Sequence, residues 1–171
     1  MNKTITSFGT AFIDPVEPLY SEIVEIGKYI AQAGYNTYCG GYSGSMEAIS
    51  KGATLAGGYT VGIGVKGNSS KPNEYLKEFI PAENLMERIM MLITKADAYV
   101  IFRGGTGTLL EISAALELMN KNGMREKKMV FYTDFWKNII ETLKQDSERL
   151  QSLIERNVIF ISAPGELSKY I

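Results

Sequence analysis

The strongest chemical signal in the sequence is a turn rich in glycine and threonine. Gly-Gly-Thr-Gly-Thr, residues 104–108, joins an apolar stretch to a segment with helical periodicity. Glycine lets backbone N–H groups approach a ligand, and the first turn of a helix carries partial positive charge. The two threonine hydroxyls add further donors, so a phosphate group is the expected ligand. The predicted phosphate-binding residues of this turn are Gly104, Gly105, Thr106, Gly107 and Thr108.

Glu111 follows this turn on the predicted helix. It shares a helical side with small or apolar residues, among them Ala115 and Leu118, which is unusual for a solvated carboxylate. A half-buried carboxylate beside an anion site is a candidate for catalysis. The alternative is structural, because Thr108-Leu-Leu-Glu111 fits the capping-box pattern, in which the glutamate reaches back to the cap amide. The sequence leaves both interpretations open.

Arg88 is a second charged residue on an apolar helical face, which it shares with Leu85, Met91 and Leu92. An arginine in this setting predicts an anionic partner. The alternative is an arginine whose aliphatic stem covers apolar surface while its head reaches water or a structural carboxylate. Two further glycine-containing turns, Gly9-Thr10 and Gly40-Gly41, follow other short apolar runs. We include Gly9, Thr10, Gly40 and Gly41 among the expected ligand-binding residues.

The elements that must position these residues alternate along the chain. Short β-branched or aromatic runs predict strands at 4–8, 36–39, 59–65, 98–102, 128–132 and 158–162. Amphipathic stretches between them predict helices at 18–33, 44–56, 84–96, 108–121, 135–154 and 164–170. Parallel strands need crossover connections, and helices provide these while covering the sheet. We therefore expect an α/β fold, a Rossmann-like parallel sheet flanked by helices on both faces, in a single domain spanning 1–171.

The carboxyl ends of parallel strands lie at one edge of the sheet, where open α/β sheets bind their ligands. The three glycine-containing turns all follow predicted strands, so they should meet at that edge. The Gly62, Gly64 and Gly67 string resembles a dinucleotide fingerprint, but it begins inside a strand and opens no helix. The expected ligand is therefore a nucleotide or sugar phosphate.

The amino-acid composition excludes several kinds of partner and reaction. Of 171 residues, 18 are Lys or Arg and 19 are Asp or Glu, which gives a formal net charge of −1 and argues against nucleic acid as a partner. The sequence has no histidine, which excludes histidine-based acid–base chemistry and Ser/His/Asp triads. Cys39 is the single cysteine, so no intrachain disulfide forms. We expect a cytoplasmic protein with no metal, no cofactor and no membrane partner.

Three segments together resemble the Lonely Guy family of cytokinin riboside 5′-monophosphate phosphoribohydrolases, long labelled possible lysine decarboxylases. The family signature Pro-Gly-Gly-x-Gly-Thr-x-x-Glu is matched by Gly104, Gly105, Gly107, Thr108 and Glu111. The family arginine upstream falls on Arg88, and the glycine-rich first motif falls on residues 39–46. The resemblance spans most of the chain.

The resemblance implies hydrolysis of the N-glycosidic bond of a nucleoside 5′-monophosphate, of the AMP or cytokinin-nucleotide type, to free base and ribose 5-phosphate. It implies that Glu111 stabilises oxocarbenium-like charge or positions the attacking water, and that Arg88 orients the ligand and balances Glu111. It also implies a homodimer, for which apolar helical surface is offered by Met86, Met90, Met91, Leu116 and Met119. Packing in the core explains these residues equally well. Lysine decarboxylation has no support, because no lysine lies in a recognisable pyridoxal phosphate motif.

The chain departs from the family pattern at three places. Arg103 replaces the signature proline, residues 39–46 read CGGYSGSM where the family has Gly-Gly-Gly-x-x-Gly-Leu-Met, and Ile89 stands where members usually carry lysine. Arg103 adds a cation at the turn, so it joins the expected phosphate-binding residues. These departures keep a second function open: a non-catalytic nucleotide sensor, or a carrier of a phosphorylated pterin such as molybdenum cofactor.

Overall fold

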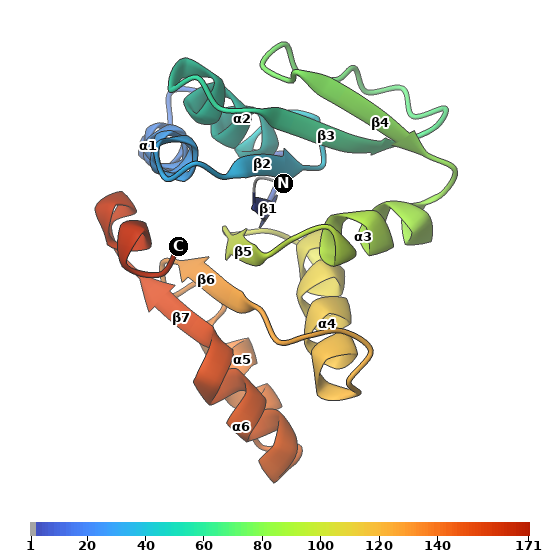
Figure 1. Cartoon of the computed structure of the whole chain (residues 1–171), viewed down its shortest axis with the longest axis vertical. Helices are drawn as coiled ribbons and strands as arrows, with labels where there is room; N and C mark the ends of the chain where they lie inside the picture. Colours follow the sequence, from blue (N-terminus) through green and yellow to red (C-terminus); the bar gives the residue numbers. More distant parts are fainter. Residues whose placement is uncertain (1–2) are drawn as a thin grey trace.

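A computed structural model describes residues 3–171 as a seven-stranded sheet in the order β4-β3-β2-β1-β5-β6-β7. Every neighbouring pair is parallel, which confirms the predicted fold class (Figure 1). The strands are β1 (Thr4–Phe8), β2 (Asn36–Cys39), β3 (Thr60–Val65), β4 (Glu78–Ala82), β5 (Ala98–Ile101), β6 (Lys128–Tyr132) and β7 (Val158–Ile161). The helices are α1 (Pro18–Gln32), α2 (Ser45–Leu55), α3 (Leu85–Thr94), α4 (Thr106–Asn120), α5 (Lys137–Leu143), α6 (Glu148–Asn157) and the 3-10 helix η1 (Pro164–Lys169).

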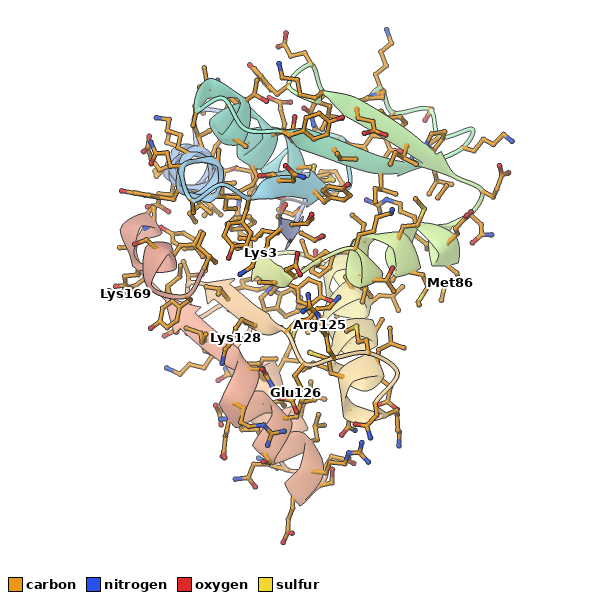
Figure 2. All side chains as sticks on the ribbon, in the orientation of Figure 1. Lys3, Met86, Arg125, Glu126, Lys128 and Lys169 are labelled. Atoms are coloured by element: carbon orange, nitrogen blue, oxygen red, sulfur yellow. The ribbon has the colours of Figure 1, made fainter. Side chains whose placement is uncertain are left out.

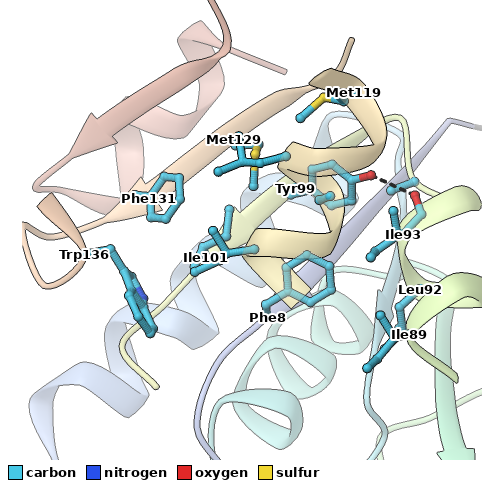
Figure 3. Packing of buried hydrophobic residues seen from close by; sticks show 14 of the residues in the cluster. Phe8, Ile89, Leu92, Ile93, Tyr99, Ile101, Met119, Met129, Phe131 and Trp136 are labelled. Carbon is cyan, nitrogen blue, oxygen red and sulfur yellow. Dashed lines mark hydrogen bonds between the residues drawn. The ribbon is translucent and has the colours of Figure 1, made fainter. Parts of the chain in front are cut away.

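The two faces of the sheet bury separate sets of apolar side chains. Along β5, Ala98 and Val100 belong to the cluster formed with α1, α2 and η1, whereas Tyr99 and Ile101 belong to the cluster formed with α3, α4, α5 and α6. Figure 3 shows part of the second cluster packed around Tyr99. Because successive strand residues point to opposite faces, a strand covered on both sides reads as a continuous apolar run, as β5 does.

The strand order reverses between β1 and β5. The chain builds β1, β2, β3 and β4 outward in one direction, then returns to place β5 on the other side of β1. The carboxyl ends of β1 and β5 therefore flank a topological switch point, where connections leave in opposite directions and open a crevice. Gly9 follows β1, and the glycine-rich turn follows β5. The fold brings these two predicted binding segments to the same crevice.

One strand was not predicted. β4 pairs with β3 at the edge of the sheet and contains Pro81, a residue that lacks the N–H of a ladder bond. An edge strand tolerates proline because one of its sides has no neighbouring strand. The connection from β3 to β4 contains no helix, so the alternation of strands and helices gave no signal there.

The helix predicted at 135–154 is two helices, α5 and α6. Ser147 is the N-cap of α6 and its side chain accepts a hydrogen bond from the Leu150 N–H at 3.3 Å. Serine at this position favours a new helix start over continuation of the preceding helix. No helix within residues 3–171 is long and apolar enough to cross a membrane.

Candidate functional site

The N-terminus of α4 opens into the crevice at the switch point. The helix begins at Thr106 with Gly105 as its N-cap, and no side chain among residues 3–171 caps it. A Cβ atom added at Gly105 or at Gly107 would meet nothing described within 4 Å. Gly105, Thr106, Gly107 and Thr108 line a cavity of about 400 Å³, within the range of small-molecule sites. The first amides of the helix are thus accessible to an anion.

The position at which α4 begins decides between the two interpretations of Glu111. The helix starts two residues before the predicted Thr108, so Thr108 is its third residue and not its cap. Glu111 therefore lies in the second turn, beyond the N3 position that a capping box requires. The capping-box alternative is wrong.

Glu111 is a buried carboxylate on the wall of this cavity. It is only 8% exposed. Burial raises its pKa from 4.5 to about 7, an effect that the positive charge of Arg88 opposes. The Arg88 Nη1 lies 3.8 Å from the Glu111 Oε1, which is beyond hydrogen-bond distance but close enough for attraction between charges. Burial thus brings the pKa of this carboxyl group toward neutral pH, which suits proton transfer.

Arg88 is fixed in the cavity wall by contacts from three directions. Its Nε–H donates to the Ile63 carbonyl of β3 at 2.7 Å, and its guanidinium carbon lies 6.0 Å from the centre of the Tyr42 ring. Glu111 provides the third contact, and the arginine side chain is 14% exposed. The head group is therefore held beside a ligand-sized space and does not extend into water, while its contact with Glu111 also fits the alternative of a structural carboxylate partner.

Gly40 provides the space that Arg88 occupies. A Cβ atom at this position would overlap the Arg88 Nη2 and lie 2.6 Å from the Met46 Sδ. Gly9 is constrained in the same way, since its Cβ would lie 2.5 Å from the Ser45 Oγ. Both glycines line the cavity, as does Thr10. The predicted turns after β1 and β2 thus meet the turn after β5.

Three predicted binding residues lie outside the lining of this cavity. Gly41 has a φ of +82°, and a Cβ atom added there would lie 3.0 Å from Phe79. Glycine at this position is therefore explained by the backbone conformation and the close packing. Gly104 packs against Thr108, whose Oγ1 an added Cβ would overlap. Arg103 donates from Nη2 to the Glu17 Oε2 at 2.6 Å, an ion pair beside the cavity.

The sequence prediction missed several residues that line the cavity. Phe12 is 88% exposed. Nothing in the sequence distinguishes it from a buried phenylalanine, so it could not be predicted as a lining residue. Met46, with 9% exposure, lies at the boundary between core and cavity. Ile89, the departure next to Arg88, is buried among apolar residues and does not line the cavity (Figure 3). The additional lining residues are Ser7, Phe8, Ala11, Phe12 and Met46.

The parallel sheet and the switch-point crevice define a Rossmann-like α/β protein, with the N-terminus of α4 exposed at the crevice. A family model described as the SLOG cluster4 family matches residues 2–159. The chain belongs to the SLOG cluster4 family.

Known proteins with other descriptions are more distantly similar. A cytokinin riboside 5′-monophosphate phosphoribohydrolase of Mycobacterium marinum is 30% identical over 122 residues, which cover 66% of this chain and 64% of that protein. This similarity supports the expected relation to the Lonely Guy family at a distance. The chain spans between 54% and 66% of the length of three curated relatives.

Solved structures share the fold over nearly the whole chain. The X-ray structure of TM1055 is 25% identical with a TM-score of 0.79, and the match covers 98% of this chain and 96% of that one. The molybdenum cofactor carrier protein from Chlamydomonas reinhardtii is 22% identical with a TM-score of 0.77, covering 99% and 95%. These two structures support the Rossmann-like assignment.

Proposed function

We propose that this protein hydrolyses the N-glycosidic bond of a nucleoside 5′-monophosphate, of the AMP or cytokinin-nucleotide type. The products are the free base and ribose 5-phosphate. The observation that carries the proposal is the pairing of the buried Glu111 with Arg88 in the cavity that the α4 amides enter. Similarity to the phosphoribohydrolase of Mycobacterium marinum supports it.

The 5′-phosphate binds at the N-terminus of α4, on the backbone amides and hydroxyl groups of residues 105–108. This places the ribose toward Glu111 and Arg88, which line the same cavity. As the bond from ribose C1′ to the base nitrogen breaks, its electron pair leaves with the base and positive charge grows on the sugar. The Glu111 carboxylate stabilises that charge.

Water completes the reaction. Its oxygen bonds to C1′, and the proton that it loses passes through Glu111 to the nitrogen of the departing base, which regenerates the carboxylate. Glu111 orients this water, and its pKa of about 7 suits it to accept the proton. Arg88 holds the carboxylate and the ligand in place. No metal or organic cofactor enters this scheme.

The test is base release from AMP and a panel of other nucleoside 5′-monophosphates, with wild type and Glu111→Gln compared. Loss of one well-placed electrostatic group typically lowers the rate by about 100- to 1,000-fold. Glu117→Gln is the matched control, because Glu117 lies on the same helix with a side chain 61% exposed and is paired with Lys121. We expect release by wild type and by the control, and its collapse in a folded Glu111→Gln.

Absence of release from every monophosphate by folded wild type would contradict the proposal. Mass spectrometry of the native protein then tests the second function. An intact nucleotide retained by the protein would indicate a non-catalytic binding protein of the same fold.

We also propose a homodimer, formed through the apolar surface of α3 and α4. Met86 and Met90 are 60% and 40% exposed, and Leu110 on α4 is 39% exposed. Figure 2 shows Met86 on the outer side of α3. Leu116 and Met119 were expected on this surface, but they are buried in the core against the sheet (Figure 3 shows Met119). Sedimentation that gives only a species of 18.9 kDa would contradict the dimer.

A further inference from the structure

A second, smaller cavity adjoins the first. Its volume is about 250 Å³ and its lining consists of Thr10, Phe12, Arg103, Gly104 and Phe135. Thr10 and Phe12 line both cavities. The two spaces are therefore neighbours that share one wall, and we call the smaller one the side pocket.

The order of the strands places the side pocket on the far side of the glycine-rich turn from Arg88. Arg88 lies at one end of the crevice. It donates a hydrogen bond to the Ile63 carbonyl of β3 and packs against Gly40, which follows β2. Phe135 follows β6, which lies beyond β5 in the opposite direction. The turn after β5 lies between these two ends. A phosphate at the α4 amides would therefore have the ribose site on one side and the side pocket on the other.

The lining of the side pocket suits a flat ring that accepts hydrogen bonds. Phe12 and Phe135 are 88% and 55% exposed, an unusual state for phenylalanine. Arg103 also lines the side pocket, with a side chain that is 39% exposed and paired through Nη2 with Glu17. The accessible part of its guanidinium therefore offers a cation and hydrogen-bond donor to an acceptor on a ligand.

The pocket is built on fixed backbone. Trp136 is 3% exposed and its Nε1–H donates to the Phe102 carbonyl at 2.8 Å, which anchors the residue next to Phe135. The rings of Phe135 and Trp136 meet edge to face with centroids 5.1 Å apart. On the other side, the Thr10 N–H donates to the Arg103 carbonyl at 3.0 Å. Both walls of the pocket are thus tied to the end of β5, which limits the ordering cost of binding.

We propose that the side pocket binds an aromatic group attached to the far side of the phosphate. The ligand class is a diphosphate-bridged compound with a second nitrogen heterocycle, which stacks against Phe12 and Phe135 and accepts a hydrogen bond from Arg103. A nucleoside monophosphate fills only the larger cavity. This inference rests on the phosphate position in the proposed function.

The test is calorimetric titration with AMP, ADP and P1,P2-di(adenosine-5′) diphosphate as probes, carried out in the Glu111→Gln background so that AMP is bound without being hydrolysed. ADP controls for the added phosphoryl group, so the comparison isolates the second ring. Stacking of a base on an aromatic side chain predicts at least about fivefold tighter binding of the diadenosine compound than of ADP. Phe135→Ala should abolish that gain and change the AMP Kd by less than about twofold. Ile139→Ala, which removes another partly exposed apolar side chain at 37% exposure, should keep the gain.

Equal binding of ADP and the diadenosine compound, or a gain that survives Phe135→Ala, would overturn the proposal. Those results leave AMP binding and hydrolysis intact, so they would not touch the proposed function. Failure of AMP to bind at all would overturn both, because both place the phosphate at α4.

Discussion

Replacement of Glu111 by glutamine should change how the stability of the protein depends on pH. Burial raises the pKa of Glu111 from 4.5 to about 7 in the folded protein, and Arg88 offsets only part of this effect. The folded state therefore binds this proton more tightly than the unfolded state does. The stability that results is fully present below pH 4.5 and is lost as the pH rises through about 7. At about 1.4 kcal/mol for each tenfold change in proton affinity, the loss amounts to about 3 kcal/mol.

The measurement is the free energy of unfolding in urea, at a series of pH values from 4.5 to 8.5, for wild type and Glu111→Gln. Glutamine cannot ionise, so between the ends of this range wild type should lose about 3 kcal/mol relative to the variant. Any effect of the substitution on the unfolding free energy that does not depend on pH cancels, because only the change between the two ends of the pH range is compared. The control Glu117→Gln, at an exposed position of the same helix, should follow the wild-type curve. Parallel curves for wild type and Glu111→Gln would refute the view that a desolvated carboxyl group lines the cavity.

Four further results are expected. If ionised Glu111 is the active form, base release should rise with pH around a midpoint of about 7, and a flat profile from pH 5 to 9 would contradict that role. Gly107→Ala adds a methyl group in open space on a helix, so it should raise the unfolding free energy by about 0.5–1 kcal/mol and weaken calorimetric binding of AMP. Gly40→Ala would overlap Arg88 and should lower kcat at least about tenfold, while wild-type kcat in a folded variant would argue against the fixed arginine. Trp136→Phe leaves a buried carbonyl without its donor and should cost about 1–3 kcal/mol in urea unfolding, and a smaller loss would show that the bond contributes little.

The sequence predicted the parts of the fold that local pattern controls. β5 and α4 could be found because an apolar run, a glycine-rich turn and a helical face follow one another directly. β4 was missed because an edge strand with Pro81 has only one neighbouring strand and no crossover helix before it. The break between α5 and α6 depends on the cap at Ser147, which periodicity alone does not reveal.

The candidate site was predictable where a residue type is itself unusual. Glu111 and Arg88 stand out as charges on apolar helical faces, and the structure places both on one cavity wall. The partner of Arg103 could not be predicted in this way, because its ion pair is with Glu17, which lies 86 positions away in the sequence. Phe135 likewise reaches the crevice only because β6 lies next to β5, which follows from the strand order and not from any local motif.

Three unusual features lie at the crevice between β1 and β5. A carboxyl group is desolvated at Glu111, Phe12 exposes an aromatic ring to water, and the Arg103 Nε is buried without a partner. The buried carboxyl group and the buried Arg103 Nε lower the stability of the folded chain, whereas the exposed Phe12 ring contributes no hydrophobic burial. Such exceptions are expected where a protein binds or transforms a ligand, because the ligand supplies the missing contacts. Phe12 lines both cavities, so one ligand that spans them would contact the amides of α4, the ring of Phe12 and the accessible part of the Arg103 guanidinium together.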